Sequence, residues 1–236
     1  MASKNLLMPS TNYWRPLQKS HSYNLKRELM DNSIPVITLF LDIGGVMLSN
    51  GWGHVSRKLA AETFHLNYDD MQSRHKLTMV TYELGKLTLD EYLNRVVFYG
   101  KRDFTPYQFR DFMFTQTTPY MDMIELIQKF KEQHKFKIAV INNEGRELNE
   151  YRIKKFQLNS FVDFFISSCF VHLRKPDADI FRLALYIAQV QAEHAVYIED
   201  MQMFVDVARD LGIRSIQHQN YLSTKNALAE MGLTIK

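Results

Sequence analysis

VITLFLDIGGV, residues 36–46, joins a run of six apolar or β-branched residues to an aspartate and two glycines. A run with almost no polar position predicts a strand, Val36–Leu41, that is buried on both faces, because an exposed face would show alternating polar residues. Such strands are typical of parallel sheets that helices cover on both sides. Asp42 therefore stands directly beyond the end of a buried strand.

Four further short runs and three helical patterns extend this unit along the chain. The runs are Lys137–Ile141, Asp163–Ser167, Ala195–Glu199 and Arg214–Gln217. Apolar residues recur at helical spacing over Met121–His134, Asp177–Val190 and Gln202–Leu211, the last of which ends before Gly212. The alternation predicts an α/β fold, a Rossmann-like three-layer core around a central parallel sheet of about five strands. Ligands of such sheets bind beyond the carboxyl ends of the strands.

No comparable strand occurs between Leu48 and Pro119, where helical patterns follow one another instead. They cover His54–Phe64 and Asp70–Leu84, and two more begin at Thr88, which opens a capping box, and at Thr105, which precedes a proline. We therefore expect a helical-bundle domain at residues 50–118, inserted into a core domain of residues 34–49 and 119–236. The aromatic and Met residues of the insert stand mostly at core positions.

The remaining residues, 1–33, are expected to form an N-terminal arm packed on the domain, anchored by Tyr13 and Trp14. The arm lacks the apolar segment and cleavage site of a signal peptide. It also accounts for the net charge of +3, since residues 1–34 carry five Lys or Arg and two Asp or Glu, which leaves the rest of the chain neutral. A neutral body argues against nucleic acid as a partner.

Cysteine content and hydropathy exclude further classes. A single cysteine, Cys169, rules out an internal disulfide framework and a Cys-rich zinc site. No apolar run approaches the ~20 residues of a membrane span. We expect a cytoplasmic protein with no membrane partner.

Polar residues of distinct chemistry follow four of the predicted strands. The first strand leads to Asp42, the second to Asn142 and Asn143, the third to a loop with Lys175, and the fourth ends in Glu199 and Asp200. Each residue alone is more often a cap or a turn residue. Their order at one rim of a parallel sheet points to a common site.

This ordered set resembles the motifs of the haloacid dehalogenase superfamily of phosphatases and phosphotransferases. That family has a strand followed by Asp-x-Asp-Gly-Thr/Val, then a strand followed by Ser/Thr-Asn, a Lys often followed by Pro, and a strand followed by Glu/Asp-Asp. The corresponding residues here are Asp42–Val46, Asn142-Asn143, Lys175-Pro176 and Glu199-Asp200. The predicted insert stands where the family has its small helical cap, and Tyr82–Thr88 resembles a stretch common in such caps.

The resemblance implies an aspartyl-phosphate mechanism with Mg²⁺. Asp42 would be the nucleophile, with Lys175 and Asn142 as further catalytic residues. Mg²⁺ would be held by Asp42, the carbonyl of Gly44 and Asp200, with Glu199 orienting a metal-bound water. The residues expected to bind the substrate are Gly44 and Gly45 through their N–H groups, Asn143 and His54.

Two positions depart from the family pattern. Gly44 replaces the aspartate that serves phosphatases as general acid and base, although some superfamily members with Asp-x-Gly are sugar-phosphate phosphatases. Asn142 replaces a Ser or Thr, and its amide can also donate to a phosphoryl oxygen. Candidate replacements for the acid are His54, His172 and Glu144, of which His54 is more simply a surface residue at a helix start.

Three functions remain open. A Mg²⁺-dependent hydrolase of small phosphomonoesters, such as a sugar phosphate, accounts for Asp42, Lys175 and Asp200 together. A catalytically impaired member that binds a phosphorylated ligand or a protein would explain Gly44 and Asn142. A 2-haloacid dehalogenase also lacks the second aspartate, but typically reads Asp-x-Tyr-Gly-Thr, which Gly44 and Val46 do not match. The residues select neither a substrate nor an oligomeric state.

Overall fold

A computed structural model describes residues 34–235, which contain one parallel sheet of five strands in the order β3-β2-β1-β4-β5. The strands are β1 (Thr38–Leu41), β2 (Lys137–Asn142), β3 (Phe164–Ser167), β4 (Ala195–Glu199) and β5 (Arg214–Gln217). Leu41 pairs with Val140 on one side and Ile198 on the other, so β1 lies at the centre and its end is flanked by the ends of β2 and β4. The predicted α/β class and five-stranded parallel sheet are confirmed.

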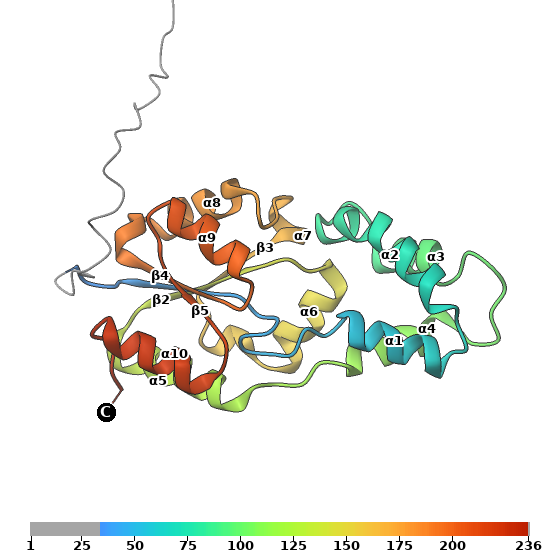
Figure 1. The fold of residues 1–236 in the computed structure, drawn as a ribbon, viewed down its shortest axis with the longest axis horizontal. Coiled ribbons are helices and arrows are strands. Elements are labelled where there is room, and N and C mark those ends of the chain that lie inside the picture. Colours follow the sequence, from blue (N-terminus) through green and yellow to red (C-terminus); the bar gives the residue numbers. More distant parts are fainter. Residues whose placement is uncertain (1–33, 236) are drawn as a thin grey trace, which may run out of the picture. The chain divides into compact units, whose positions relative to one another are not determined.

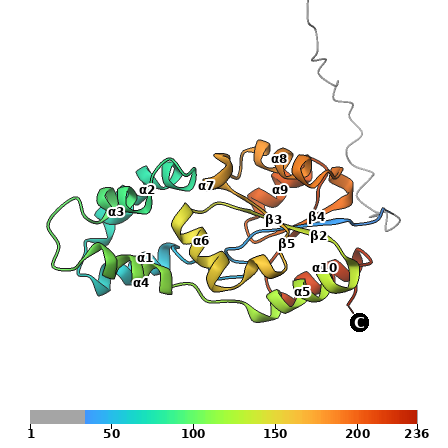
Figure 2. The same cartoon turned by 180° about the vertical axis from the view of Figure 1, so that it is seen from behind.

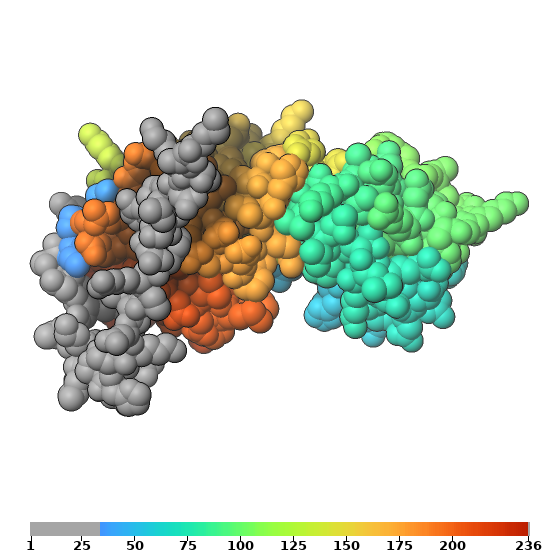
Figure 3. All heavy atoms as spheres, turned by 90° about the horizontal axis from the view of Figure 1, so that it is seen from above, coloured from blue at the N-terminus to red at the C-terminus, as the bar shows by residue number. Residues whose placement is uncertain are grey.

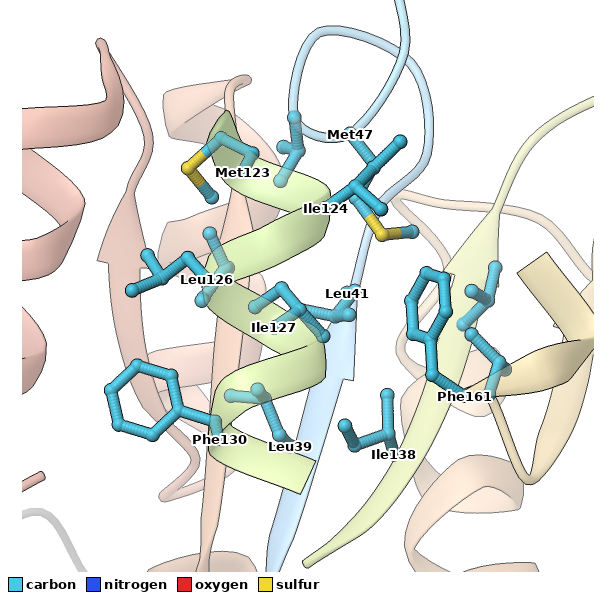
Figure 4. Close-up of a cluster of buried hydrophobic side chains, with 14 of the residues drawn as sticks. Leu39, Leu41, Met47, Met123, Ile124, Leu126, Ile127, Phe130, Ile138 and Phe161 are labelled. Atoms are coloured by element: carbon cyan, nitrogen blue, oxygen red, sulfur yellow. The ribbon is translucent and has the colours of Figure 1, made fainter. Parts of the chain in front are cut away.

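Helices cover both faces of the sheet (Figures 1 and 2). Leu39 and Leu41 point to the face packed by α5 (Met121–His134) and α10 (Tyr221–Glu230), where Figure 4 shows α5 side chains against β1. Phe40, between them, points to the face packed by α8 (Ala178–Ala188) and α9 (Gln202–Asp210). Burial on both faces explains why these strands have no polar alternation.

The helix bounds follow local signals in the sequence. Asp177 accepts a hydrogen bond from the Asp179 N–H and caps α8, while Gly212, with φ +85°, follows the end of α9. Two helices were absent from the sequence prediction, α6 (Arg146–Lys155) and α10, as were the four-residue α7 (Ser168–Val171) and the 3₁₀ turns Leu158–Ser160 and Ala192–His194. The segment of α6, RELNEYRIKK, is mostly polar and offers too few apolar positions to define a helical face.

Four helices occupy the segment between β1 and α5. They are α1 (His54–Thr63), α2 (Tyr68–Glu83), α3 (Leu89–Val96) and α4 (Pro106–Thr115). Thr88 and Thr105 form the capping boxes that open α3 and α4. The helix α2 begins two residues before the predicted position because Asn67 accepts a hydrogen bond from the Asp70 N–H and caps it there. The four helices pack around their own apolar cluster, which includes Trp52, Tyr92 and Phe109.

The end of α2 contacts the loop that leads to Lys175. Ser168 Oγ donates to the Glu83 carbonyl at 2.7 Å, and Arg174 Nη2 lies 2.7 Å from Glu83 Oε2. Figure 3 shows this contact between the teal surface of α2 and the orange surface of the α7 region. The four-helix segment is thus tied to the rim of the sheet where the strands end.

Two further expectations concern the chain ends and the membrane. The N-terminal arm, residues 1–33 with Tyr13 and Trp14, lies outside the described residues. Within residues 34–235, none of the helices has the length and apolar character that crossing a membrane requires.

Candidate active site

Lys175 is buried between two carboxylates at the carboxyl ends of β1 and β4. Its Nζ lies 2.9 Å from Asp42 Oδ1 and 2.6 Å from Glu199 Oε2. Asp42 follows β1 directly and its N–H donates to the Ile198 carbonyl of β4, which fixes the two strand ends together. Only 1% of the Lys175 surface is exposed. Burial alone would lower the pKa of this amine, but Asp42 and Glu199 raise it, so Lys175 stays charged.

Three carboxylates meet at this point. Asp42, Glu199 and Asp200 each offer an oxygen, and these oxygens all lie within 4.8 Å of one another. Burial, more than the neighbouring carboxylates, raises the pKa of Asp42 to about 7, although Lys175 opposes it. Burial also raises the pKa of Asp200 to about 7, together with the hydrogen bond and the charge of Glu199. The cluster therefore has more acidic groups than the single lysine compensates.

This imbalance fits a bound divalent cation. Carboxylate oxygens are the ligands that Mg²⁺ prefers, and Mg²⁺ usually keeps several waters besides one or two carboxylates. Glu199 differs from its neighbours: burial raises its pKa, but Lys175 and hydrogen bonds from Asp200, Lys175 and Tyr197 outweigh burial and lower it. Asp42 and Asp200 are thus the acids left with the least compensation from protein groups, and a cation would relieve them.

Tyr197 is a member of the site that the sequence analysis missed. Its hydroxyl donates to Glu199 Oε2 and lies 3.2 Å from Lys175 Nζ. Burial raises the pKa of Tyr197 well above its usual value, so the hydroxyl stays protonated as a donor. Tyr197 and Glu199 are two apart in β4 and therefore point to the same face, which is the signal that could have revealed it.

The loop after Asp42 contains Gly45, whose N–H was predicted to bind phosphate. The N–H of Gly45 donates to the Leu48 carbonyl at 2.7 Å, so it is not free to bind phosphate. Gly45 has φ +79°, and a Cβ there would lie 2.3 Å from Asp200 Oδ2. Glycine at this position allows Asp200 to approach the loop after β1.

Gly44 faces another residue that the sequence analysis missed, Asn50. A Cβ on Gly44 would lie 2.7 Å from Asn50 Oδ1 but meets no backbone atom closer than 3.8 Å. The amide of Asn50 therefore occupies the space that a side chain at position 44 would enter.

The two asparagines after β2 are held by protein groups. Asn143 accepts a hydrogen bond from the Lys175 N–H at 2.9 Å and donates one from Nδ2 to the Lys175 carbonyl at 2.8 Å. The sequence analysis expected Asn143 to bind the substrate, but its side chain is engaged by the Lys175 backbone and positions that residue. Asn142 Nδ2 donates to Asn149 Oδ1 at 2.9 Å. In the described part of the chain, the buried Asn142 Oδ1 has no hydrogen-bond partner.

The three candidates for a replacement acid lie in different surroundings. His54 is the exposed first residue of α1, and His172 Nδ1 lies 2.7 Å from the Leu84 carbonyl. Glu144 is buried and pairs with Arg152 Nη1 at 2.6 Å. Burial raises the pKa of Glu144, opposed by Arg152. None of the three is hydrogen-bonded to Asp42, Lys175 or Asp200 in the structure of residues 34–235.

Two adjoining cavities open at the site. The smaller, about 340 Å³, is lined by the residues that follow the strands, among them Asp42, Asn142, Lys175 and Asp200. The larger, about 780 Å³, is lined mainly by residues of the four-helix segment, including His54. Both cavities share the lining residues Asn50, Met79, Glu83, Asn143 and Glu144. A molecule that reaches Asp42 can therefore extend into the larger cavity.

Comparisons with known proteins agree with this geometry. Residues 58–217, more than half of the chain, match the family model of the haloacid dehalogenase-like hydrolases, in a range that begins after Asp42. A protein of Caldanaerobacter subterraneus subsp. tengcongensis, proposed to be the pyrophosphatase PpaX, is 28% identical over 95 residues. Those residues are 40% of this chain and 43% of that protein, so the chain spans less than half the length of this curated relative.

Solved structures share the fold. The family enzyme bt-2542 of Bacteroides thetaiotaomicron, in complex with magnesium and inorganic phosphate, has a TM-score of 0.66 at 16% identity, over 78% of this chain and 94% of that one. A 2-haloacid dehalogenase of Pseudomonas syringae has a TM-score of 0.55 at 15% identity, over 78% and 86%. Such identities show the fold alone.

Proposed function

Because the chain belongs to the haloacid dehalogenase-like hydrolases, we propose that it is a Mg²⁺-dependent phosphatase of small phosphomonoesters, such as sugar phosphates. The proposal includes a core domain of residues 34–49 and 119–236 with a cap domain of residues 50–118. The phosphate-bound and magnesium-bound relative supports it, as do the three carboxylates that meet beside a lysine.

One observation carries the proposal: the ammonium group of Lys175 lies 2.9 Å from a carboxylate oxygen of Asp42, although the two residues are 133 positions apart in the sequence. A carboxylate that attacks a phosphate dianion is repelled by it, so positive charge has to be held at the point of attack. A buried lysine in contact with the nucleophile fulfils this need, because the low local dielectric strengthens its effect.

Each residue then has a role in two successive displacements. Asp42 attacks phosphorus, the P–O bond to the ester oxygen breaks, and this oxygen takes a proton from solvent as the alcohol leaves. Water then attacks phosphorus and loses a proton to solvent, which releases phosphate and frees Asp42. Lys175 stabilises negative charge on the phosphoryl oxygens in both steps. Asp42, Asp200 and the carbonyl of Gly44 would hold Mg²⁺, with Glu199 oriented by Lys175 and Tyr197. The ion would supply further positive charge at the phosphoryl group.

The Asn142 amide can replace the Ser or Thr hydroxyl of the family as a hydrogen-bond donor to the phosphoryl group. A half-turn of the Asn142 and Asn149 amides together would keep the hydrogen bond between them and let Asn149 Oδ1 accept from Ser167 Oγ. It would also replace the unpartnered Asn142 Oδ1 by N–H donors. In this arrangement Asn142 donates to a phosphoryl oxygen.

The missing acid limits the leaving groups that the enzyme handles well. The Asn50 amide beside Gly44 can donate a hydrogen bond to a leaving oxygen, but it cannot transfer a proton at neutral pH. General acid catalysis contributes about 10²–10⁴-fold. We therefore expect the enzyme to favour esters of acidic alcohols over simple alkyl esters.

Hydrolysis of p-nitrophenyl phosphate tests the proposal. We expect turnover with Mg²⁺, its loss in excess chelator, and its loss in the isosteric variant Asp42→Asn, because the amide is no nucleophile. The matched control is Asp69→Asn, the same change at an exposed aspartate of α2, which should retain full activity. Turnover by Asp42→Asn at the rate of the parent protein would contradict the mechanism.

The second candidate is a protein that binds phosphorylated ligands without turnover. It is favoured by Gly44 and by the ion pair that engages Glu144 with Arg152. Its signature would be a Mg²⁺-dependent affinity for inorganic phosphate with no hydrolysis of p-nitrophenyl phosphate. A 2-haloacid dehalogenase would instead release halide in excess chelator, a result that the acidic cluster at Asp42 argues against.

A further inference from the structure

The larger cavity contains a buried arginine without a carboxylate partner. Arg57, on α1, is 7% exposed and lines the cavity. Its Nε donates to Gln72 Oε1 at 2.8 Å and its Nη1 to the Trp52 carbonyl at 2.5 Å. Within residues 34–235 it forms no ion pair, and three of its five N–H groups have no acceptor. A buried guanidinium is normally paired, because an uncompensated charge is costly to bury.

The carboxylates that line the same cavity are already engaged. Glu83 pairs with Arg174 at 2.7 Å and Glu144 pairs with Arg152 at 2.6 Å. Lys76 adds a further cationic side chain to the lining. The charge of Glu83 also acts on Arg57, but the Glu83 carboxylate is paired with Arg174. Within the described cavity lining, no carboxylate therefore forms an ion pair with Arg57.

One neutral group beside Arg57, the His75 ring, also offers a donor. Trp52 Nε1 donates to the Tyr92 hydroxyl at 2.8 Å, and that hydroxyl lies 2.8 Å from His75 Nδ1. Burial lowers the pKa of His75 to about 3, so the ring is neutral and one of its nitrogens accepts. The buried Tyr92 hydroxyl is satisfied when it donates to Nδ1, which places the His75 proton on Nε2 as a donor.

We propose that this cavity binds a second anionic group, a carboxylate or a phosphate, carried by the leaving part of the substrate. The inference rests on the proposed phosphatase function and adds a substrate class to it. The shared residues between the two cavities allow one molecule to place its phosphoryl group at Asp42 and its second anion at Arg57. A guanidinium with free N–H groups binds either anion by charge-assisted hydrogen bonds.

Three probes with the same six-carbon chain test the inference: glucitol 6-phosphate, 6-phosphogluconate and glucitol 1,6-bisphosphate. We expect kcat/KM to be at least tenfold higher for one or both of the compounds with an anionic group at each end than for glucitol 6-phosphate. For the bisphosphate, this gain is counted beyond the factor of two that its two ester positions give. The better of the two identifies carboxylate or phosphate as the second group. Equal or lower kcat/KM for both would overturn the inference.

The variant Arg57→Met assigns the effect to the residue. It should lose the tenfold preference through a higher KM for the compound that carries the second anion, and far-UV circular dichroism shows whether the variant is folded. Lys58→Met removes a positive charge from the same helix at an exposed position outside the cavity lining and should keep the preference. If Arg57→Met does not fold, Arg57→Lys, which keeps the charge but not the fork, should weaken the preference. An unchanged preference in a folded Arg57 variant would overturn the assignment.

Failure of the phosphatase proposal is distinguishable from failure of the anion site. If neither p-nitrophenyl phosphate nor any of the three compounds is hydrolysed, the proposed function fails. Dissociation constants of the parent protein for the three compounds then test the anion site directly. A tenfold tighter binding of a compound with the second anion supports the site, whereas equal dissociation constants overturn it.

Discussion

At the scale of single residues, the site depends on neighbouring residues that position the charged groups. Gly45 has no side chain where Asp200 approaches, Asn143 holds the backbone of Lys175, and Tyr197 holds Glu199. None of the three has to touch a substrate to matter. They determine where the charges of Lys175 and Asp200 stand relative to Asp42, and a charge displaced by about 1 Å can cost 10²-fold in rate.

The space beside Gly44 gives a prediction at this scale. In the double variant Gly44→Asp/Asn50→Ala, a carboxyl group can enter the space that the Asn50 amide occupies. We expect kcat on alkyl phosphates to rise about 10–100-fold, because the leaving alcohol gains a proton donor, with little change on p-nitrophenyl phosphate. Gly44→Asp alone should gain less, since the Asn50 amide has to move aside.

The control for this gain is Gly44→Asn/Asn50→Ala, which has the same shape but cannot transfer a proton. Steady-state rates on an alkyl and an aryl phosphate compare the variants. An equal gain from the asparagine variant, or none from either, would mean that proton donation at position 44 does not limit the rate.

At the scale of elements, α2 and α3 are joined by the buried hydrogen bonds of His75, Tyr92 and Trp52. This network predicts how stability depends on pH. Burial, with smaller contributions from Arg57 and Lys76, lowers the pKa of His75 from 6.5 to about 3. Below pH 6.5 the unfolded chain takes up a proton that the folded chain refuses, so the free energy of unfolding falls as the pH drops from 6.5 to 3.

Urea unfolding at pH 7.5 and pH 4.5 measures the effect. The loss attributable to His75 between these values is about 2–3 kcal/mol, from the separation of pH 4.5 and the unfolded pKa. We expect His75→Gln to remove that part of the pH dependence, whereas His54→Gln, at an exposed position, should leave it in place. The same pH dependence in His75→Gln and in the parent protein would contradict the assignment.

The strands and helices differ in how well the sequence predicts them. Strands that are buried on both faces consist of apolar runs, which are recognisable in the sequence. The helices α3 and α4 begin at capping boxes, so the first residue of each helix was predicted correctly. The helix α6 was not predicted, because its stability comes from contacts such as the buried Leu148, Asn149 and Arg152 and not from a regular apolar face.

At the scale of the whole molecule, the sequence predicted which residues gather at one rim of the sheet because parallel strands end there. It did not predict how they pair. The Gly45 N–H was expected at a phosphate and is engaged by Leu48, and the Asn143 side chain was expected at a substrate and is engaged by Lys175. Such partners depend on loop conformation and on distant segments, which no local pattern encodes. The larger cavity likewise forms between helices of the four-helix segment and the loops after β1 and β2, which are far apart in the sequence.

Phosphorylation of Asp42 beside Lys175 can be detected in a single-turnover experiment. The parent protein is mixed with Mg²⁺ and p-nitrophenyl phosphate, quenched in acid within the first turnover, digested and analysed by mass spectrometry. We predict that the peptide containing Asp42 gains the mass of one phosphoryl group, and that Asp42→Asn shows no such gain. Hydrolysis of the ester with the phosphoryl group on another residue, or in Asp42→Asn as fast as in the parent protein, would contradict the account.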